Sequence, residues 1–184
     1  MRLFVLLAGV LAAGSSFQAP AQVFAPGVIS NDTWQWRLTF APDGHTAYFS
    51  QSDGFFPATR QATIYRSRLR DGAWSTPEVA PFSGTHADMD PFITRDGNWL
   101  YFSSIRPQGG VERADLDLWR VEKRGAGWGE PERLGPEVNT DADELYASVA
   151  SDGTLYFASG PAAPARRRLP HGSSTRRSRL TARC

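Results

Sequence analysis

The sequence has very little of what several protein classes require. Only one of its 184 residues is cysteine, Cys184, so an internal disulfide framework and a cysteine-rich zinc site are both excluded. Twenty Lys and Arg face 19 Asp and Glu, a formal net charge of +1, which does not indicate a uniformly basic nucleic-acid-binding protein. No apolar run approaches the roughly 20 residues that a transmembrane helix needs, so no membrane span is predicted.

Aromatic and turn-forming residues are abundant instead. The chain has 11 Phe, 6 Trp and 5 Tyr beside 17 Gly and 13 Pro. Aromatic side chains favour strands, and Gly and Pro favour turns, so the composition predicts β-structure rather than a helical bundle. The length suits about one domain.

The N-terminus has the three parts of a secretory signal peptide. Arg2 supplies the positive charge, Leu3 to Ala13 form a short apolar run, and Ala19-Pro20-Ala21 resembles a cleavage site. We predict a signal peptide over 1–21, with cleavage between Ala21 and Gln22, and hence a periplasmic or secreted protein. Because no cysteine adjoins the cleavage point, a lipoprotein is excluded; a buried N-terminal helix or strand is the alternative to a signal.

The body of the chain repeats itself. Asp-Gly pairs followed by an aromatic segment lie 53 and then 56 residues apart, and the Trp and Pro residues of the second half of each unit recur at a spacing of 54. Internal repeats of this length are typical of solenoids and propellers. After a linker over 22–30 we therefore predict repeats over 31–159, in two full units (31–84 and 85–139) and a partial one (140–159).

Each unit has the pattern of antiparallel strands. Asp-Gly between two β-like segments is a strong hairpin signal, because Gly adopts positive φ without steric cost. A third strand and a proline-bounded outer strand complete the unit, and four short strands per 53–56 residues are the signature of a propeller blade. We predict an all-β fold, an incomplete β-propeller of about two and a half four-stranded antiparallel blades. The aromatic pairs expected to pack between blades are Tyr48, Phe49, Tyr101, Phe102, Tyr156 and Phe157.

The second unit contains Leu-Tyr-Phe-Ser-Ser, Arg-Pro-x-Gly-Gly, Asp-Leu-Trp and Gly-Trp-Gly-Glu-Pro in that order. With these motifs the chain resembles, over about 30–159, the WD40-like β-propeller repeat of the PD40, TolB-like type. The first unit departs from the pattern at Gln51 to Gly54, and the third matches only to Ser159. The residues of the repeat signature are Asp43, Gly44, Tyr48, Phe49, Asp96, Gly97, Tyr101, Phe102, Asp117, Trp119, Trp128, Pro131, Asp152, Gly153, Tyr156 and Phe157.

This resemblance implies a propeller that closes with six or seven blades. It also implies two kinds of relative, namely protein-docking propellers of the periplasm and the propeller halves of prolyl-oligopeptidase-like enzymes. A fold does not by itself determine a function.

The composition changes at Gly160. Residues 160–184 hold seven Arg, one His and no acidic residue, which leaves 13 basic and 19 acidic residues in 1–159, a formal net charge of −6. Because the change falls inside a repeating unit, we interpret 160–184 as an unstructured Arg-rich tail that arises from out-of-frame translation. The alternatives are a native disordered tail and a basic arm for anionic lipid, polysaccharide or nucleic acid.

Catalytic motifs are not found in the sequence. It has no Gly-x-Ser-x-Gly, no His-Glu-x-x-His and no Gly-rich phosphate loop, and its three histidines (His45, His86 and His171) are far apart. We therefore predict no cofactor and no enzymatic activity of this chain.

Alternating carboxylates are the remaining candidates for a site. They could bind Ca²⁺, which prefers oxygen ligands, although the spacing is not that of an EF-hand. The alternative is that they accept hydrogen bonds in turns or face solvent. The candidate metal ligands are Asp88, Asp90, Asp115, Asp117, Asp141 and Asp143.

The functional prediction is a non-catalytic extracytoplasmic module that docks an unknown protein or envelope polymer and has no nucleic-acid partner. Loops carry binding residues in such scaffolds, so the loops that start at 85 and 140 and the loop 105–114 are the expected surface. Two alternatives remain, the N-terminal propeller part of a secreted peptidase or glycan-active enzyme, and a module that self-associates through open blade faces.

Overall fold

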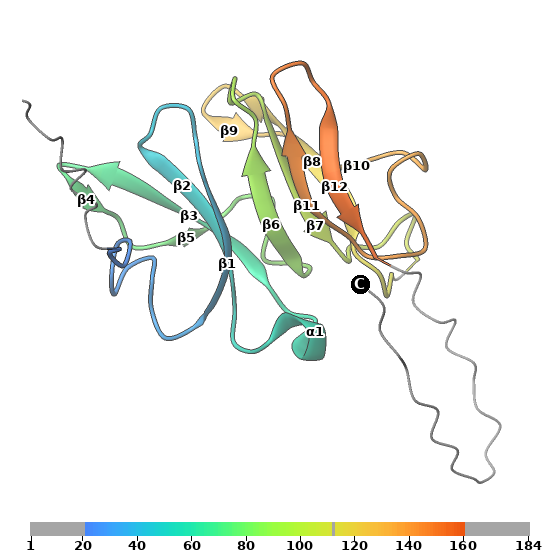
Figure 1. Cartoon of the computed structure of the whole chain (residues 1–184), viewed down its shortest axis with the longest axis horizontal. Coiled ribbons are helices and arrows are strands. Elements are labelled where there is room, and N and C mark those ends of the chain that lie inside the picture. Colours follow the sequence, from blue (N-terminus) through green and yellow to red (C-terminus); the bar gives the residue numbers. More distant parts are fainter. Residues whose placement is uncertain (1–20, 112, 161–184) are drawn as a thin grey trace, which may run out of the picture.

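The computed structural model describes residues 21–111 and 113–160, and apart from one helical turn their regular secondary structure consists of β-strands (Figure 1). Most of the predicted signal peptide and nearly all of the Arg-rich tail lie outside the described residues. No helix among the described residues has the length and apolarity needed to cross a bilayer.

The first blade is a sheet whose strands are all antiparallel. Its long strands follow one another in the order β1-β2-β3, and two short segments both pair with β3. The only helix of this blade, α1, is a single turn in the loop between β2 and β3. The bounds are β1 Trp34–Phe40, β2 Thr46–Ser52, α1 Phe56–Thr59, β3 Thr63–Arg70, β4 Ala73–Trp74 and β5 Glu78–Val79.

The second blade repeats this arrangement, and the third sheet begins it again. The second sheet has the order β6-β7-β8-β10, with β9 as a short extension of β8, and the third consists of β11 and β12. The predicted all-β fold of successive four-stranded antiparallel blades is confirmed. The bounds are β6 Asp88–Ile93, β7 Trp99–Ser104, β8 Asp117–Arg124, β9 Gly127–Trp128, β10 Glu132–Arg133, β11 Glu144–Val149 and β12 Leu155–Ser159.

Asp-Gly turns join the first two strands of every blade, as predicted. Gly44, Gly97 and Gly153 have φ values of 67°, 73° and 87°, a region in which a side chain would be strained. The preceding aspartate accepts a hydrogen bond from the backbone N–H two residues further on, which closes each turn. The turn residues of the repeat therefore have a local structural role.

The main core lies between the first and second blades. Tyr48 and Ile64 of the first blade pack with Leu100, Phe102 and Val121 of the second, and all five are buried. The indole N–H of Trp128 donates to the Tyr48 hydroxyl at 3.1 Å, and burial raises the pKa of Tyr48. Each blade therefore depends on its neighbour for a buried face, as expected for a repeat architecture.

A bulge interrupts the inner strand of each blade at the same place in the repeat. The register shifts at Arg37 in β1, next to Asp90 in β6 and next to Tyr146 in β11, each six residues before the Asp of the Asp-Gly turn. A bulge adds one residue to a strand and so moves the following side chains to the other face. In β1, Trp36 consequently packs toward the second blade, whereas Phe40 packs toward Phe24.

The two outer blades differ in how their outer faces are covered. Phe24 and Ile29 of the N-terminal segment pack against the first blade, but no other described strand pairs with β12. The prediction that the aromatic pairs pack between blades is therefore correct for Tyr48 and Phe102, whereas Phe49 is buried against the N-terminal segment and Tyr101 is half-buried. It is wrong for Tyr156 and Phe157, which are 61% and 38% exposed because no described segment lies over them.

Candidate functional site

Loops from all three blades meet at one end of the sheets. The β2–β3 loop (53–62), the β7–β8 loop (105–116, apart from residue 112) and the β10–β11 loop (134–143) lie at the end where α1 is drawn in Figure 1, opposite the Asp-Gly turns. We call this surface the α1 rim. The predicted docking loops at 105–114 and 140 therefore lie together here, and so does the start of β6 after the loop at 85, where Ala87 bonds to Ile105.

An arginine joins the three loops. Arg60 ends α1 in the left-handed conformation (φ 52°), and its guanidinium donates to the carbonyl of Ala114 and to Asp143 at 3.4 Å. Asp143 in turn accepts the backbone N–H of Leu116 at 2.7 Å. The ion pair is partly exposed and so contributes at most about 1 kcal/mol, but it holds the loops in one arrangement.

A cavity of about 280 Å³ lies inside the α1 rim. Three of its lining residues, Trp36, Met89 and Leu145, occupy the same position in successive repeats, so the cavity marks where the three inner strands converge. Phe56 and Leu116 complete an apolar wall, and Arg60 and Asp143 lie at its edge. Ligand sites commonly have this character, a concave apolar surface with a few polar groups.

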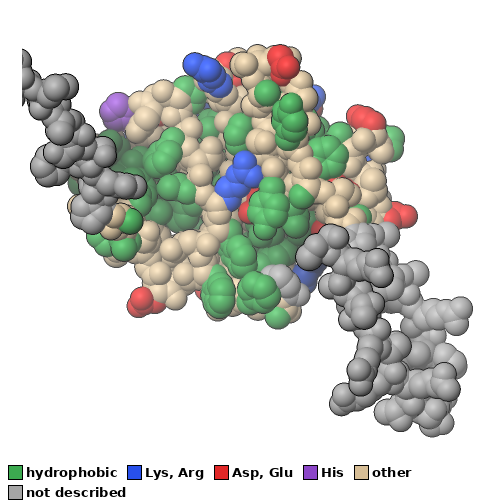
Figure 2. All heavy atoms as spheres, viewed as in Figure 1, with side chains coloured by type: hydrophobic (Ala, Val, Ile, Leu, Met, Phe, Trp, Pro, Cys, Tyr) green, Lys and Arg blue, Asp and Glu red, His purple; other side chains and the backbone are tan. Residues whose placement is uncertain are grey.

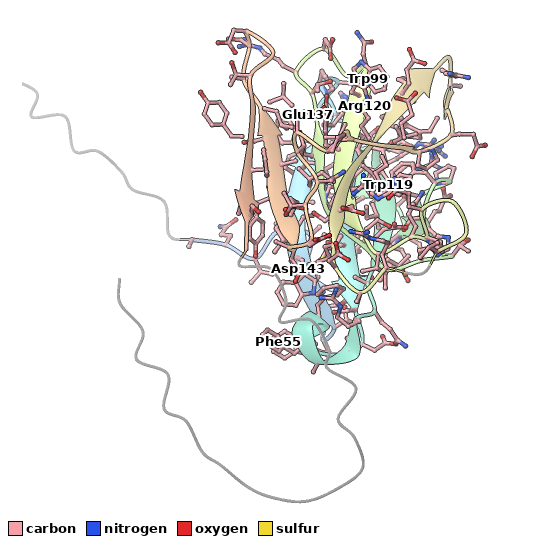
Figure 3. The ribbon with its side chains drawn as sticks, turned by 90° about the vertical axis from the view of Figure 1, so that its right-hand side faces the viewer. Phe55, Trp99, Trp119, Arg120, Glu137 and Asp143 are labelled. Carbon is pink, nitrogen blue, oxygen red and sulfur yellow. The ribbon has the colours of Figure 1, made fainter. Side chains whose placement is uncertain are left out.

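Exposed aromatic side chains adjoin the cavity. Trp34 and Phe55 are 51% and 50% exposed, and their rings lie 5.6 Å apart between centroids, with Trp36 within 6.1 Å of both. Figure 2 shows hydrophobic side chains gathered over this end of the molecule, and Figure 3 shows Phe55 beside α1 with Asp143 close by. A contiguous exposed apolar surface of this kind marks an interaction site more often than isolated exposed residues do.

A second, larger hollow of about 460 Å³ lies at the opposite end, between the Asp-Gly turns of the second and third blades. Trp99 and Tyr101 line it, and the guanidinium of Arg120 lies over the Trp99 ring at 4.2 Å, as their neighbouring labels in Figure 3 illustrate. The turns at 94–96 and 150–153 form much of its wall. It lacks the exposed aromatic cluster of the α1 rim, so we regard the rim as the stronger candidate.

Most of the predicted metal ligands are engaged by arginine. Asp88 accepts from Arg106 at 2.7 Å, and Asp117 accepts two hydrogen bonds from Arg133, both at 2.8 Å. Asp115 pairs with Arg113, Asp143 with Arg60, and Asp141 is exposed. No three His, Cys, Asp or Glu side chains within the described ranges are grouped so as to hold a metal ion. Guanidinium groups therefore balance the charges of four of the candidates, Asp88, Asp115, Asp117 and Asp143.

Asp90 is the exception among the acidic residues. It sits at the bulge of β6 with φ 54°, it is buried, and neither carboxylate oxygen has a hydrogen-bond partner among the described residues. Burial raises the pKa of Asp90 to about 6, and the nearby charge of Arg37 opposes that rise. The carboxyl group is thus poised to change its charge in mildly acidic solution.

Sequence reasoning missed the aromatic part of the α1 rim. The signal was present, because the first unit departs from the repeat at Gln51 to Gly54 and has Phe55-Phe56 directly afterwards. A departure from an internal repeat that introduces apolar residues into a loop is a functional indication, since the blade itself does not require it. His45 lies in the Asp-Gly turn at the opposite end, where it is exposed and hydrogen-bonds within its own turn.

Comparison with known proteins yields only remote similarity. No family model matches the sequence, and no curated protein matches it. Among solved structures the chain is similar to TolB from Acinetobacter baumannii (TM-score 0.45, 17% identity, 69% of this chain and 27% of that chain). It is also similar to a puromycin-hydrolyzing peptidase of Mycobacterium tuberculosis (TM-score 0.48, 18% identity, 69% and 19%). The chain spans less than a third of either protein, and the description as propeller blades rests on the blades themselves.

Proposed function

We propose that this chain is a non-catalytic propeller-repeat module, exported from the cytoplasm, that docks a protein or an envelope polymer through the α1 rim. The observation that supports it most is the exposed pair Trp34 and Phe55, which lies against the partly buried Trp36 beside a cavity shared by three blades. Export rests on the composition of the N-terminus and is tested by finding Gln22 as the first residue of the protein in the periplasm or medium.

The physical argument for docking is the cost of leaving these rings in water. Each Å² of apolar surface that a partner covers contributes roughly 25 cal/mol, and aromatic residues dominate the binding energy of many interfaces. Arg60 and Asp143 tie the rim loops to one another, which reduces the conformational entropy that is lost when a partner binds. The rim is therefore suited to binding without any chemical step.

A photo-cross-linking residue at chosen positions tests the proposal in cells. Phe55 is the position on the α1 rim, and the exposed Asp43 at the opposite end is the matched control. We expect adducts with another envelope component at position 55 and none at position 43. Adducts of equal yield at both positions, or none at position 55, would contradict docking through this rim.

Self-association is a second candidate function, favoured by the third blade. Tyr156 and Phe157 are exposed on β12, which pairs only with β11 among the described residues, and an uncharged edge strand is a template for another strand. We expect Tyr156→Lys to shift the purified protein toward monomer in sedimentation velocity. A wild-type protein that is monomeric at every concentration tested would reject this candidate.

A further inference from the structure

We propose that the α1 rim binds a cationic peptide segment of a partner protein. One large apolar side chain of that segment fills the cavity, and Lys or Arg residues on either side of it face the carboxylates around the rim. This inference rests on the proposed function, since it names the chemistry of the docked partner.

The size of the cavity limits what it holds. At about 280 Å³ it lies just below the range of roughly 300–1,000 Å³ typical of sites for whole small molecules. A single large apolar side chain is therefore a better match than a cofactor or a chain of sugar rings. Interfaces commonly use such an anchor residue in a pocket near the centre of the contact.

The residue types of the α1 rim are those of protein interfaces. Trp36, Met89 and Tyr146 line the cavity, and Arg60 lies at its edge with its guanidinium 5.3 Å from the Phe56 ring centroid. Trp, Tyr, Met and Arg are enriched where proteins bind one another, and Met adapts its shape to different anchors. Tyr146 is half-exposed, so it is already open to a partner.

The charge around the cavity indicates the sign of the charge on the partner segment. Asp53 and Asp141 are exposed on the rim loops, and Asp32 is exposed just before Trp34. The three arginines of the rim loops do not balance them, because each already donates to another group of the protein. Arg106 donates to Asp88. Arg60 donates to Ala114 and Asp143, and Arg113 donates to Asp115 and Thr140. Among the described residues the uncompensated charge of the rim is therefore negative, so basic residues of a partner complement it and acidic residues are repelled.

Synthetic peptides with blocked ends test the inference on the purified full chain. The probe has a central leucine with three lysines on each side; one comparison peptide replaces leucine by alanine, and the other replaces all lysines by glutamate. Titration is followed by calorimetry and by the fluorescence of the rim tryptophans. We expect saturable binding of the probe, at least tenfold weaker binding of both comparison peptides, and further weakening as salt rises from 50 to 500 mM, since salt screens exposed charges.

Rim variants locate the binding. Phe55→Ala and the double change Asp53→Asn with Asp141→Asn alter exposed side chains, so the fold is expected to survive, which circular dichroism checks. Each variant is expected to bind the probe peptide about tenfold more weakly than the wild type does. Glu130→Gln, an exposed carboxylate outside the rim loops, is the matched control and is expected to leave binding unchanged.

The outcomes separate this inference from the proposed function. If position 55 cross-links a partner in cells but the peptides do not bind, docking stands and the cationic partner is wrong. If the glutamate peptide binds as well as the probe, or if Glu130→Gln weakens the probe as much as the rim variants, the inference is overturned. If neither cross-links nor peptide binding are found, both proposals fall.

Discussion

The first and second blades follow one repeat but are held together by different interactions. Both have the same exposed ion pair between the third and fourth strands, Arg66–Glu78 in the first blade and Arg120–Glu132 in the second, 54 residues apart. Within the part of the chain that the structure describes, only the second blade has buried ion pairs, in which Asp88 bonds to Arg106 and Asp117 to Arg133. The repeat therefore specifies the strands, while the buried electrostatics belong to one blade.

The equivalent positions of the first blade hold other residues in place of the buried ion pair between Asp88 and Arg106. Gln35 and Asp53 stand where the second blade has Asp88 and Arg106, and the loop that follows Asp53 forms α1. Phe56 of α1 is buried against Met89 and Leu116, whereas Phe55 remains exposed. The loop that lacks the ionic contact thus supplies Phe55 and Phe56, the aromatic residues of the α1 rim.

Removing the buried arginine of the second blade is expected to give the largest difference in stability between matched changes in the two blades. In Arg106→Ala the fully buried Asp88 loses its partner, and breaking a buried pair costs about 3–5 kcal/mol. The matched change Asp53→Ala in the first blade is expected to alter stability by less than about 0.5 kcal/mol, because that side chain is exposed. Urea unfolding measures both, and equal losses in the two variants would contradict the difference between blades.

Neutralising Asp90 is expected to change how stability depends on pH. An acid whose pKa is raised on folding, here from 3.8 to about 6, binds its proton more tightly in the folded state. Its contribution to the free energy of unfolding is therefore fully present below pH 3.8 and is lost, by about 2–3 kcal/mol, as the pH rises to 6. Unfolding at pH 4 and pH 7 should show Asp90→Asn gaining stability over wild type only at the higher pH.

The matched change for Asp90 is Arg37→Gln, at the equivalent bulge of the first blade. Because the charge of Arg37 holds the pKa of Asp90 down, its loss is expected to enlarge the fall in stability between pH 4 and pH 7. If the free energy of unfolding depends on pH in the same way for wild type and Asp90→Asn, the carboxyl group is not buried in solution.

A smaller effect is expected from the hydrogen bond that crosses between the blades. Tyr48→Phe leaves the indole N–H of Trp128 without its acceptor, at a cost of about 0.5–1.5 kcal/mol. Tyr156→Phe, the same position in the third blade, is the control and is expected to have no effect because its side chain is mostly exposed. Thermal unfolding compares the two variants. An unchanged melting temperature for Tyr48→Phe would indicate that solvent replaces the hydrogen bond to Trp128.

The exposed ion pairs should have the smallest effect of all, and the same in both blades. Hydrogen bonding to Arg66 lowers the pKa of Glu78, yet that carboxylate is mostly exposed to solvent. We expect Glu78→Ala and Glu132→Ala to shift the melting temperature by less than Tyr48→Phe does. A large loss for only one of them would place an unrecognised difference between the blades at their outer edges.

Local rules explain why much of the fold was predictable. The Asp-Gly turns need only Gly at positive φ and a carboxylate that closes the turn, and both are visible at Asp96 and Gly97. The candidate site was predicted less well. Of the predicted loops, 105–114 and 140 lie on the α1 rim, but Trp34, Phe55 and the cavity were not foreseen, because they depend on side chains of three blades meeting.

The sequence by itself determined the repeat, the turns and the order of four strands in a blade, since each depends on residues that are neighbours along the chain or across one hairpin. Tertiary structure alone decided which face each inner-strand side chain takes, because one added residue at Arg37, Asp90 or Tyr146 reverses the faces that follow. It also decided that Arg106 lies beside Asp88 and Arg133 beside Asp117, since those pairs join residues 18 and 16 positions apart whose approach only the folded blade creates.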